Sequence, residues 1–350
     1  MTMEVSAYQI DSADGRFTKT TITRREPGPT EVFFDVKFAG ICHSDIHTGR
    51  GEWGKCLYPL VPGHEIAGIV TKVGSDVTKF KVGDRVGVGC FVDSCGECDE
   101  CRSGWENFCL RGETVGTYNS IGRDGLPTAG GYSRGITVEQ DYVLRIPDEI
   151  PLEKAAPILC AGITTYSPLK RWGAGPGKKV AVIGVGGLGH MAVQIAAALG
   201  AEVTGIGRTL SKRDDAMKMG ATDYVASSDP EAMKTLRKTF DIIITTVSDG
   251  LDLNLLLSLL KNRGVLVDVG MPEHPAELHV KRLIGGNKVL TGSNIGGIPE
   301  TQEVLDFCAE HNVAPWVEII GGEDIDDAWD KVVGSQVRYR YVIDTSTFDD

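Results

Sequence analysis

The chain has 350 residues, 41% of them hydrophobic, so it can bury a large core and is long enough for two domains. Its 36 basic and 48 acidic residues give a formal net charge of −12, which disfavours nucleic acids and anionic membranes as partners. We see no N-terminal segment that resembles a signal peptide and no apolar stretch long enough to span a membrane, so we expect a soluble cytoplasmic protein.

The first part of the chain contains short β-like runs that are separated by glycine turns. Residues 31–36, 66–70 and 84–88 are examples. Short strands closed by Gly-Asp and Gly-Ser turns predict a compact, mostly β domain with long loops.

From about Pro157 the pattern changes, because apolar strands alternate with amphipathic helices. We expect strands at residues 179–184, 202–207, 241–246, 265–270 and 289–293. Helices are expected between them, one ending at Leu199 and another over 211–219. This alternation predicts an α/β fold with a doubly wound parallel sheet. The tail, including 337–344, returns to β-like character and is expected to pack on the first domain.

Four cysteines lie in one tight run with the spacing C-x2-C-x2-C-x7-C. They are Cys95, Cys98, Cys101 and Cys109. Four thiolates at this spacing can wrap one ion in a closed tetrahedral shell, which leaves no position for a substrate. We expect a structural zinc, although the ligands alone would also suit iron.

A second and dispersed set of ligands would leave one coordination position open. Cys42 and Cys160 lie on either side of the string Gly63-His64-Glu65 in the sequence. A lone histidine would more often belong to a turn or a core, but here it stands in a long glycine-containing motif. Zinc at such a site would polarise an alcohol or carbonyl oxygen and lower the pKa of a bound hydroxyl. The remaining cysteines are interpreted as unpaired thiols, namely Cys56, Cys90 and Cys308.

A glycine-rich loop stands between the first strand and the first helix of the expected parallel sheet. Its sequence fits G-x-G-x-x-G, in which glycines permit a tight turn, close approach of a pyrophosphate and close helix–strand packing. The loop therefore predicts a dinucleotide site at Gly184, Gly186, Gly187, Leu188 and Gly189.

The end of the next strand indicates which dinucleotide binds. An acidic residue there would hold the ribose 2′-hydroxyl of NAD, but this chain has Gly207-Arg208-Thr209. The glycine is expected to leave space, and Arg208 suits a 2′-phosphate, with Lys212 adding charge one helical turn on. The residues therefore favour NADP, the alternative being that Arg208 is only a solvated residue at a strand end.

With these motifs in place, the chain resembles a zinc-dependent medium-chain alcohol dehydrogenase of the cinnamyl alcohol dehydrogenase branch, which includes bacterial NADP-dependent members. The resemblance runs over essentially the whole chain and is carried by residues 39–45, 61–65, 159–166, 184–190 and 337–342. One departure is that members of this branch commonly carry a serine cluster where this chain has Gly207-Arg208-Thr209, so the donors to the phosphate differ.

The resemblance implies a Rossmann doubly wound parallel sheet plus a β-rich GroES-like catalytic domain. Residues 1–156 with 297–350 would form the zinc-binding catalytic domain, and residues 157–296 the dinucleotide-binding domain. Related proteins are often homodimers joined through the edge of the Rossmann sheet, which we expect at 289–295.

The resemblance also implies roles for individual residues. The catalytic zinc would be bound by Cys42, His64 and Cys160, with Glu65 able to enter its shell when substrate is absent. Ser44 would hydrogen-bond the alkoxide on the zinc and pass its proton toward His47 through the nicotinamide ribose, while Asp45 would orient His64. Further contacts to the cofactor are expected from His43, Thr164 and Arg338.

Three apolar residues lie near strings that line the substrate cleft in this family, namely Trp53, Phe91 and Ile298. Apolar walls around zinc would suit aromatic or medium aliphatic aldehydes and primary alcohols, although each of these residues could equally belong to the core. An NAD-dependent polyol or sugar dehydrogenase, a non-catalytic zinc protein and a zinc-free quinone reductase are the alternatives. The first should have an acid at the second strand end, the second a broken ligand or relay position, and the third neither cysteine set.

Overall fold

The structure is a computed structural model that describes residues 2–248, 250–272 and 274–349. The chain forms two compact units. The first unit comprises Met1–Cys160, Gly296–Glu310 and Ala314–Asp350, and the second comprises Ala161–Ile295 and His311–Val313.

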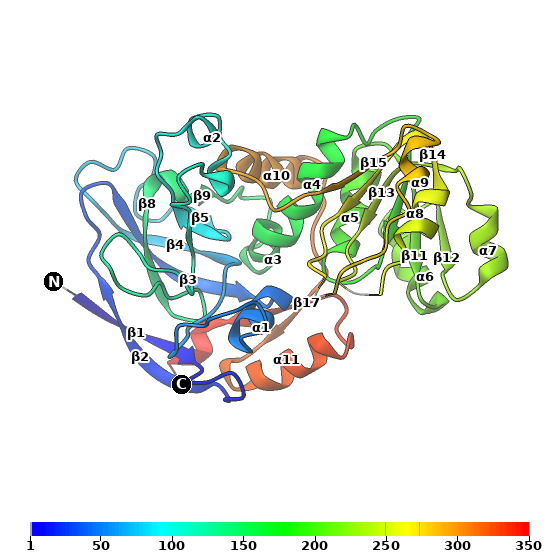
Figure 1. Cartoon of the computed structure of the whole chain (residues 1–350). Helices are drawn as coiled ribbons and strands as arrows, with labels where there is room; N and C mark the ends of the chain where they lie inside the picture. Colours follow the sequence, from blue (N-terminus) through cyan, green and yellow to red (C-terminus); the bar gives the residue numbers. More distant parts are fainter. Residues whose placement is uncertain (1, 249, 273, 350) are drawn as a thin grey trace. The chain divides into compact units, whose positions relative to one another are not determined.

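The first unit is built on a seven-stranded mixed sheet whose strands come from distant parts of the chain (Figure 1). Its strands are β3 (Glu31–Gly40), β4 (Ile66–Val73), β5 (Arg85–Val88), β8 (Gly135–Glu139), β9 (Leu144–Arg145), β16 (Val317–Ile320) and β17 (Arg340–Asp344). They follow the order β16-β17-β3-β4-β5-β9, and β8 also pairs with β3. The C-terminal tail thus joins the first unit, as expected, because β17 runs antiparallel to β3.

Smaller elements surround this sheet. Two antiparallel pairs are formed by β1 (Thr2–Gln9) with β2 (Thr18–Arg25) and by β6 (Phe91–Asp93) with β7 (Val115–Gly116). The α-helices of this unit are α1 (His43–Gly49), α2 (Asp99–Arg102), α3 (Leu152–Pro157), α10 (Ile298–Glu310) and α11 (Ile325–Val333). The short 3-10 helices are η1 (Glu106–Phe108), η2 (Gln140–Tyr142), η5 (Gly322–Asp324) and η6 (Thr345–Phe348).

One buried cluster fixes the position of α1, which carries several of the predicted site residues. Ile41, Ile46 of α1 and Trp329 of α11 all lie in this cluster. A Cβ atom at Gly49 would lie only 2.6 Å from the Trp329 ring, so α1 and α11 are closely packed.

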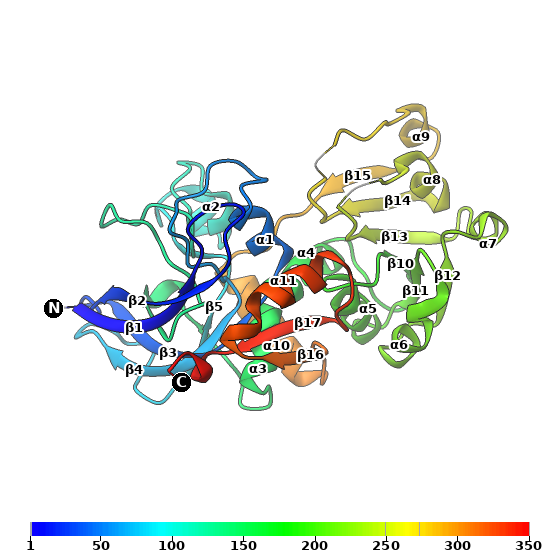
Figure 2. The same cartoon turned by 90° about the horizontal axis from the view of Figure 1, so that it is seen from below.

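The second unit contains a six-stranded sheet in which all neighbouring strands are parallel (Figure 2). Its strands are β10 (Lys179–Ile183), β11 (Glu202–Gly207), β12 (Asp223–Ala226), β13 (Phe240–Thr245), β14 (Leu260–Asp268) and β15 (Val289–Gly292). The order β12-β11-β10-β13-β14-β15 reverses direction between β10 and β13, where a dinucleotide binds in doubly wound folds. The predicted doubly wound parallel sheet is confirmed.

The helices of the second unit precede or connect these strands. They are α4 (Ile163–Arg171), α5 (Gly189–Ala198), η4 (Leu210–Lys212), α6 (Arg213–Lys218), α7 (Pro230–Thr235), α8 (Leu253–Leu259) and α9 (Lys281–Ile284), and a π-helical turn, η3 (Ile158–Gly162), precedes α4. None of the helices in the described parts of the chain is long and apolar enough to cross a membrane.

Several expected element bounds were wrong. The helix expected over 211–219 is a 3-10 turn followed by a short α6, and the tail strand begins only at Arg340. The strand expected at 265–270 begins earlier, because Leu260 already pairs with Phe240 of β13. The four-residue strand β12 was not predicted.

Candidate metal centres and dinucleotide site

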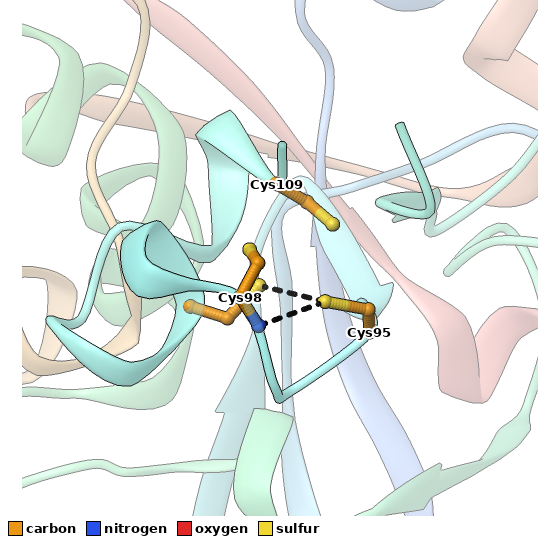
Figure 3. Close-up of side chains that lie close together, drawn as sticks. Cys95, Cys98 and Cys109 are labelled. Carbon is orange, nitrogen blue, oxygen red and sulfur yellow. Dashed lines mark hydrogen bonds between the residues drawn. The ribbon is translucent and has the colours of Figure 1, made fainter. Parts of the chain in front are cut away.

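The four cysteines of the tight run come together in a loop of the first unit. The sulfur atoms of Cys95, Cys98, Cys101 and Cys109 all lie within 4.8 Å of one another. Figure 3 shows the first, second and fourth of these side chains close together, with the amide of Cys98 donating to Cys95 Sγ at 3.3 Å. The 3.8 Å between Cys95 Sγ and Cys101 Sγ is close to the edge of a tetrahedron with ~2.3 Å zinc–sulfur bonds.

The backbone around this loop favours thiolates. Hydrogen bonds from the amides of Cys101 and Leu110 lower the pKa of Cys98, and the amide of Glu97 donates to Cys95 Sγ at 3.4 Å. N–H groups that point at sulfur stabilise its charged form. The backbone of the loop itself therefore makes these cysteines suitable metal ligands.

A second group of potential ligands lies deep in the first unit. Cys42 precedes α1, His64 and Glu65 precede β4, and Cys160 lies in η3. Their ligand atoms are within 4.8 Å of one another and all four residues are buried. Cys42 Sγ and Cys160 Sγ are 3.9 Å apart, and His64 Nε2 lies 3.2 Å from Cys160 Sγ. These separations also suit one tetrahedral ion.

Asp45 holds this second centre in place. Its fully buried carboxylate accepts hydrogen bonds from the amides of Cys42 at 2.9 Å and Gly63 at 3.2 Å, and it lies 3.0 Å from His64 Nδ1. If Nδ1 carries the proton that is donated to Asp45, the Nε2 lone pair faces the two thiols. This is the tautomer that a metal-binding histidine requires.

A buried ion pair completes the second centre. Arg340 donates to Glu65 Oε1, and neither side chain is more than 4% exposed. Burial raises the pKa of Glu65 to about 7, although the positive charge of Arg340 opposes this shift. In the described part of the chain the second carboxylate oxygen, Oε2, is buried without a hydrogen-bond partner. A buried carboxylate with an orphaned oxygen, grouped with two thiols and an imidazole, fits a divalent cation, so the residues present suit the expected zinc.

Sequence reasoning missed members of this neighbourhood, among them Arg340 and Cys90. Arg340 lies in the string 337–342, but nothing local distinguishes it from Arg338, and only the pairing of β17 with β3 brings it to Glu65. Cys90 was placed outside both cysteine sets, yet it hydrogen-bonds Cys160. The described cysteines form no disulfide, so both sets are available as thiols.

The predicted proton-relay residues lie on α1. Ser44 Oγ is 3.6 Å from Cys42 Sγ, beside the second centre. His47 lies about one turn further on; its Nδ1 pairs with Glu52, and its ring stacks on Trp53 with centroids 4.9 Å apart. Glu52 was not predicted, because an acid in a polar loop carries no signal of its own.

The three predicted pocket residues have different surroundings. Trp53 is 41% exposed, whereas Phe91 is buried against Tyr142 with ring centroids 6.0 Å apart. The amide of Ile298 donates to Glu106 at 2.9 Å. The contacts described for these residues do not join the three to one another.

The glycine loop of the second unit uses its glycines in three different ways. Gly184 has a φ of +84°, which favours glycine in the turn. A Cβ at Gly186 would meet nothing within 4 Å, and a Cβ at Gly189 would overlap the carbonyl oxygen of Gly184. Gly187 and Leu188 lie between them, directly before α5. The loop thus has a tight turn, an open edge and a close helix–strand contact, as a pyrophosphate-binding loop requires.

The end of β11 carries the predicted phosphate-binding residues. Lys212 Nζ donates to the carbonyl of Val185 in the glycine loop at 2.8 Å, and Arg208 is exposed. Thr209 accepts a hydrogen bond from the amide of Ser211. The expectation that Gly207 leaves space is wrong on one side of the strand, because a Cβ there would overlap the hydroxyl oxygen of Tyr224.

The other residues predicted to contact the cofactor are separately placed. Thr164 is buried in α4, and His43 is exposed at the start of α1. Arg338 donates from its amide to Glu318 at 3.0 Å and holds its guanidinium over the Tyr339 ring.

Comparison with known proteins places the chain in a family. Residues 28–148 match the alcohol dehydrogenase GroES-like domain, and residues 187–310 match the zinc-binding dehydrogenase domain. The chain belongs to the zinc-binding alcohol dehydrogenase family and is therefore an oxidoreductase. These matches confirm the predicted family and the predicted combination of a GroES-like domain with a Rossmann sheet.

Particular relatives cover nearly the whole chain. NADP-dependent alcohol dehydrogenase C 1 of Mycolicibacterium smegmatis is 61% identical over 98% of this chain and 98% of its own length. The structure of a cinnamyl alcohol dehydrogenase from Sorghum bicolor superposes with a TM-score of 0.95 at 42% identity, covering 98% of both chains. That of the cinnamyl alcohol dehydrogenase from Helicobacter pylori complexed with NADP(H) gives 0.93 at 44% identity, covering 99% of both.

Proposed function

We propose that this chain is a zinc- and NADP(H)-dependent alcohol dehydrogenase that interconverts primary alcohols and aldehydes. The observation that carries the proposal is the convergence of Cys42, His64, Cys160 and a carboxylate oxygen of Glu65, all buried and within 4.8 Å of one another. The relatives support the cofactor, because the Mycolicibacterium smegmatis protein is named for NADP and the Helicobacter pylori structure contains NADP(H).

The proposal divides the work between two parts of the chain. Residues 1–156 with 297–350 would bind zinc and substrate, and residues 157–296 would bind the dinucleotide. The ligand clusters support the first assignment, except that Cys160 lies four positions beyond residue 156, still inside the first compact unit of the structure. The glycine loop on a parallel sheet supports the second assignment. The set Cys95, Cys98, Cys101 and Cys109 would hold a structural zinc.

When bound, zinc would supply a Lewis acid that polarises the alcohol or carbonyl oxygen, and the nicotinamide would give or take the hydride. The remaining work belongs to side chains. Asp45 fixes the His64 tautomer, and Arg340 compensates the buried charge of Glu65.

The proton would be handled on α1. Ser44 Oγ, 3.6 Å from Cys42 Sγ, would exchange a proton with the substrate oxygen. His47, whose Nδ1 pairs with Glu52, would hold the proton next. Glu52 and Trp53 would act by fixing the orientation of this imidazole.

The substrate side of the proposal rests on apolar surface. Trp53 stacks on His47 and remains 41% exposed, so it offers an aromatic face next to the proposed relay. Such a surface favours aromatic or medium aliphatic aldehydes over sugars, which would require polar side chains.

The test is steady-state reduction of benzaldehyde and cinnamaldehyde with NADPH and with NADH, on wild type, Ser44→Ala and His47→Gln. Cys56→Ser is the matched control, because Cys56 is half-buried and lies outside both ligand sets. We expect turnover that prefers NADPH, falls about 10²-fold or more in either relay variant and is unchanged in the control. Absence of turnover by a protein with two bound zinc ions, or turnover of polyols with NADH instead, would reject the proposal.

Two finer points belong to the same proposal. The strand β15 forms one edge of the parallel sheet, and we propose that two copies join there as a homodimer, which light scattering of the purified protein will test. We also propose a cytoplasmic location, because the nine cysteines are free thiols and two ligand sets need thiolates, and cell fractionation will test it.

A further inference from the structure

A tyrosine of the unpredicted strand β12 packs against the last residues of the neighbouring strand β11. Tyr224 is only 4% exposed and is paired in register with Gly205. A Cβ at Gly205 would lie 2.6 Å from Tyr224 Cδ2 and 3.4 Å from Val185 Cγ2. The tyrosine ring therefore lies over the glycines of β11, on the side of the sheet where the glycine loop passes.

The hydroxyl end of this ring reaches the last residue of the strand. A Cβ at Gly207 would overlap the Tyr224 hydroxyl oxygen, and the next ring atom, Cζ, would be 3.1 Å away. In dinucleotide-binding folds the side chain that emerges at the end of the second strand hydrogen-bonds the ribose 2′-hydroxyl, and in NAD-dependent proteins it is acidic. Tyr224 thus places a neutral hydroxyl where that side chain would begin.

Two cations accompany this hydroxyl. Arg208 follows Gly207 directly and is exposed, and Lys212 Nζ lies 2.8 Å from the carbonyl of Val185. A phosphate on the ribose 2′-oxygen would carry about two negative charges, for which a hydroxyl donor with neighbouring cations is a suitable environment. A carboxylate at residue 207 would be excluded twice, by overlap with the hydroxyl and by repulsion of the phosphate.

We propose that Tyr224 determines the cofactor specificity of this protein: its hydroxyl replaces the side chain missing at residue 207, keeps an acid out of that position and donates a hydrogen bond to the 2′-phosphate of NADP(H). The inference rests on the proposed function and adds a residue that the glycine loop and the strand-end motif do not contain. It also explains why residue 207 is glycine: the tyrosine hydroxyl lies where any larger side chain would begin.

The first test measures binding without catalysis. Calorimetric titration with adenosine 2′,5′-bisphosphate and with adenosine 5′-monophosphate compares wild type with Tyr224→Phe. We expect the variant to bind the bisphosphate about tenfold more weakly, the loss typical of one hydrogen bond to a charged group, and to bind the monophosphate as wild type does. Equal affinity of the two proteins for the bisphosphate would overturn the inference. A wild type that does not prefer the bisphosphate would instead reject NADP(H) as the cofactor, and the inference with it.

The second test is a double-mutant cycle on the contact itself. Gly207→Ala should lower the midpoint of thermal unfolding in the wild-type background, because the new methyl overlaps the tyrosine hydroxyl. The same change in Tyr224→Phe should lower it much less, since the nearest remaining atom is 3.1 Å away. Equal shifts in both backgrounds would show that the hydroxyl does not occupy the position, and would contradict the proposal. Gly207→Asp should gain monophosphate selectivity only in the phenylalanine background.

Discussion

Replacing Asp45 with asparagine should weaken the second candidate metal centre without removing any of its potential ligands. The carboxylate is fully buried and uses both of its oxygens as acceptors. Oδ2 accepts from the amide of Cys42, and Oδ1 accepts from the amide of Gly63 and faces His64 Nδ1. An amide side chain has one acceptor oxygen and one donor nitrogen, so it cannot reproduce this pattern in either orientation.

The expected loss of stability is set by whichever orientation of the new amide group loses fewer hydrogen bonds. If the new NH2 group takes the Oδ2 position, it meets the amide of Cys42, and one buried donor loses its partner. If it takes the Oδ1 position, it meets the amide of Gly63 and also forces His64 to accept at Nδ1, which leaves the proton on Nε2, where a metal should bind. The first orientation loses less, about 2–3 kcal/mol of unfolding free energy. Zinc affinity should fall about 10–100-fold, the range found when a partner of a ligating histidine is removed.

The assay compares Asp45→Asn with wild type by urea unfolding in the presence of a chelator and by competition for zinc with a chromophoric chelator. Asp148→Asn is the matched control, because its side chain is 92% exposed and lies 3.9 Å from Arg85 Nε. The control should behave as wild type in both measurements. Unchanged unfolding midpoint and unchanged zinc affinity in Asp45→Asn would show that the carboxylate neither satisfies these donors nor orients the imidazole.

Three further predictions test other parts of the structure. Gly186→Ala should fold like wild type but bind dinucleotide more weakly. Gly189→Ala should be destabilised even without ligand, because its new methyl group, unlike that at residue 186, would overlap the backbone. Thermal unfolding and nucleotide titration will distinguish the two variants. Cys98→Ser should reduce the zinc content from two ions to one per chain, measured by elemental analysis, while retained occupancy of both would refute the four-thiolate site. Burial raises the pKa of Asp241, but hydrogen bonds from groups that include Lys261 outweigh burial and hold this pKa below its usual value. The ionised carboxylate therefore stabilises the fold at pH values above the unfolded pKa of about 4. This stabilisation is lost as the pH falls through the folded pKa. Asp241→Asn should therefore be about 1 kcal/mol less stable than wild type near pH 7 and equally stable near pH 2, as measured by unfolding in denaturant at both pH values.

Local patterns predicted the parts of this protein whose geometry is itself local. The strand Glu202–Gly207 was predicted with its observed bounds, and the glycine loop that follows β10 has the turn, opening and close contact that its sequence pattern implies. Each of these features is determined by residues within a few positions of one another. The same applies to the four-cysteine loop, whose spacing alone indicates how it folds.

What the sequence did not indicate depends on pairing between distant segments. Arg340 becomes a partner of Glu65 only because β17 lies beside β3, and Tyr224 reaches Gly207 only because β12 lies beside β11. A tyrosine in a four-residue strand has no periodic pattern strong enough to be recognised, and a buried arginine looks like its exposed neighbours until the sheet is known. These residues modify the charge and shape of sites whose existence the motifs had already indicated.

The contrast between the two ligand sets shows how the fold contributes to chemistry. The ligands of the first set lie within one short loop, so little chain entropy opposes their meeting, and backbone amides already favour their thiolates. Cys42 and Cys160 are 118 positions apart and meet only after the mixed sheet has formed. Gly40 of β3 illustrates the dependence, because a Cβ there would overlap the carboxylate of Glu65. The second centre is therefore a product of the packed sheet, which positions its potential ligands and can leave one coordination position open. The self-contained loop would close completely around an ion, which could then only stabilise the fold.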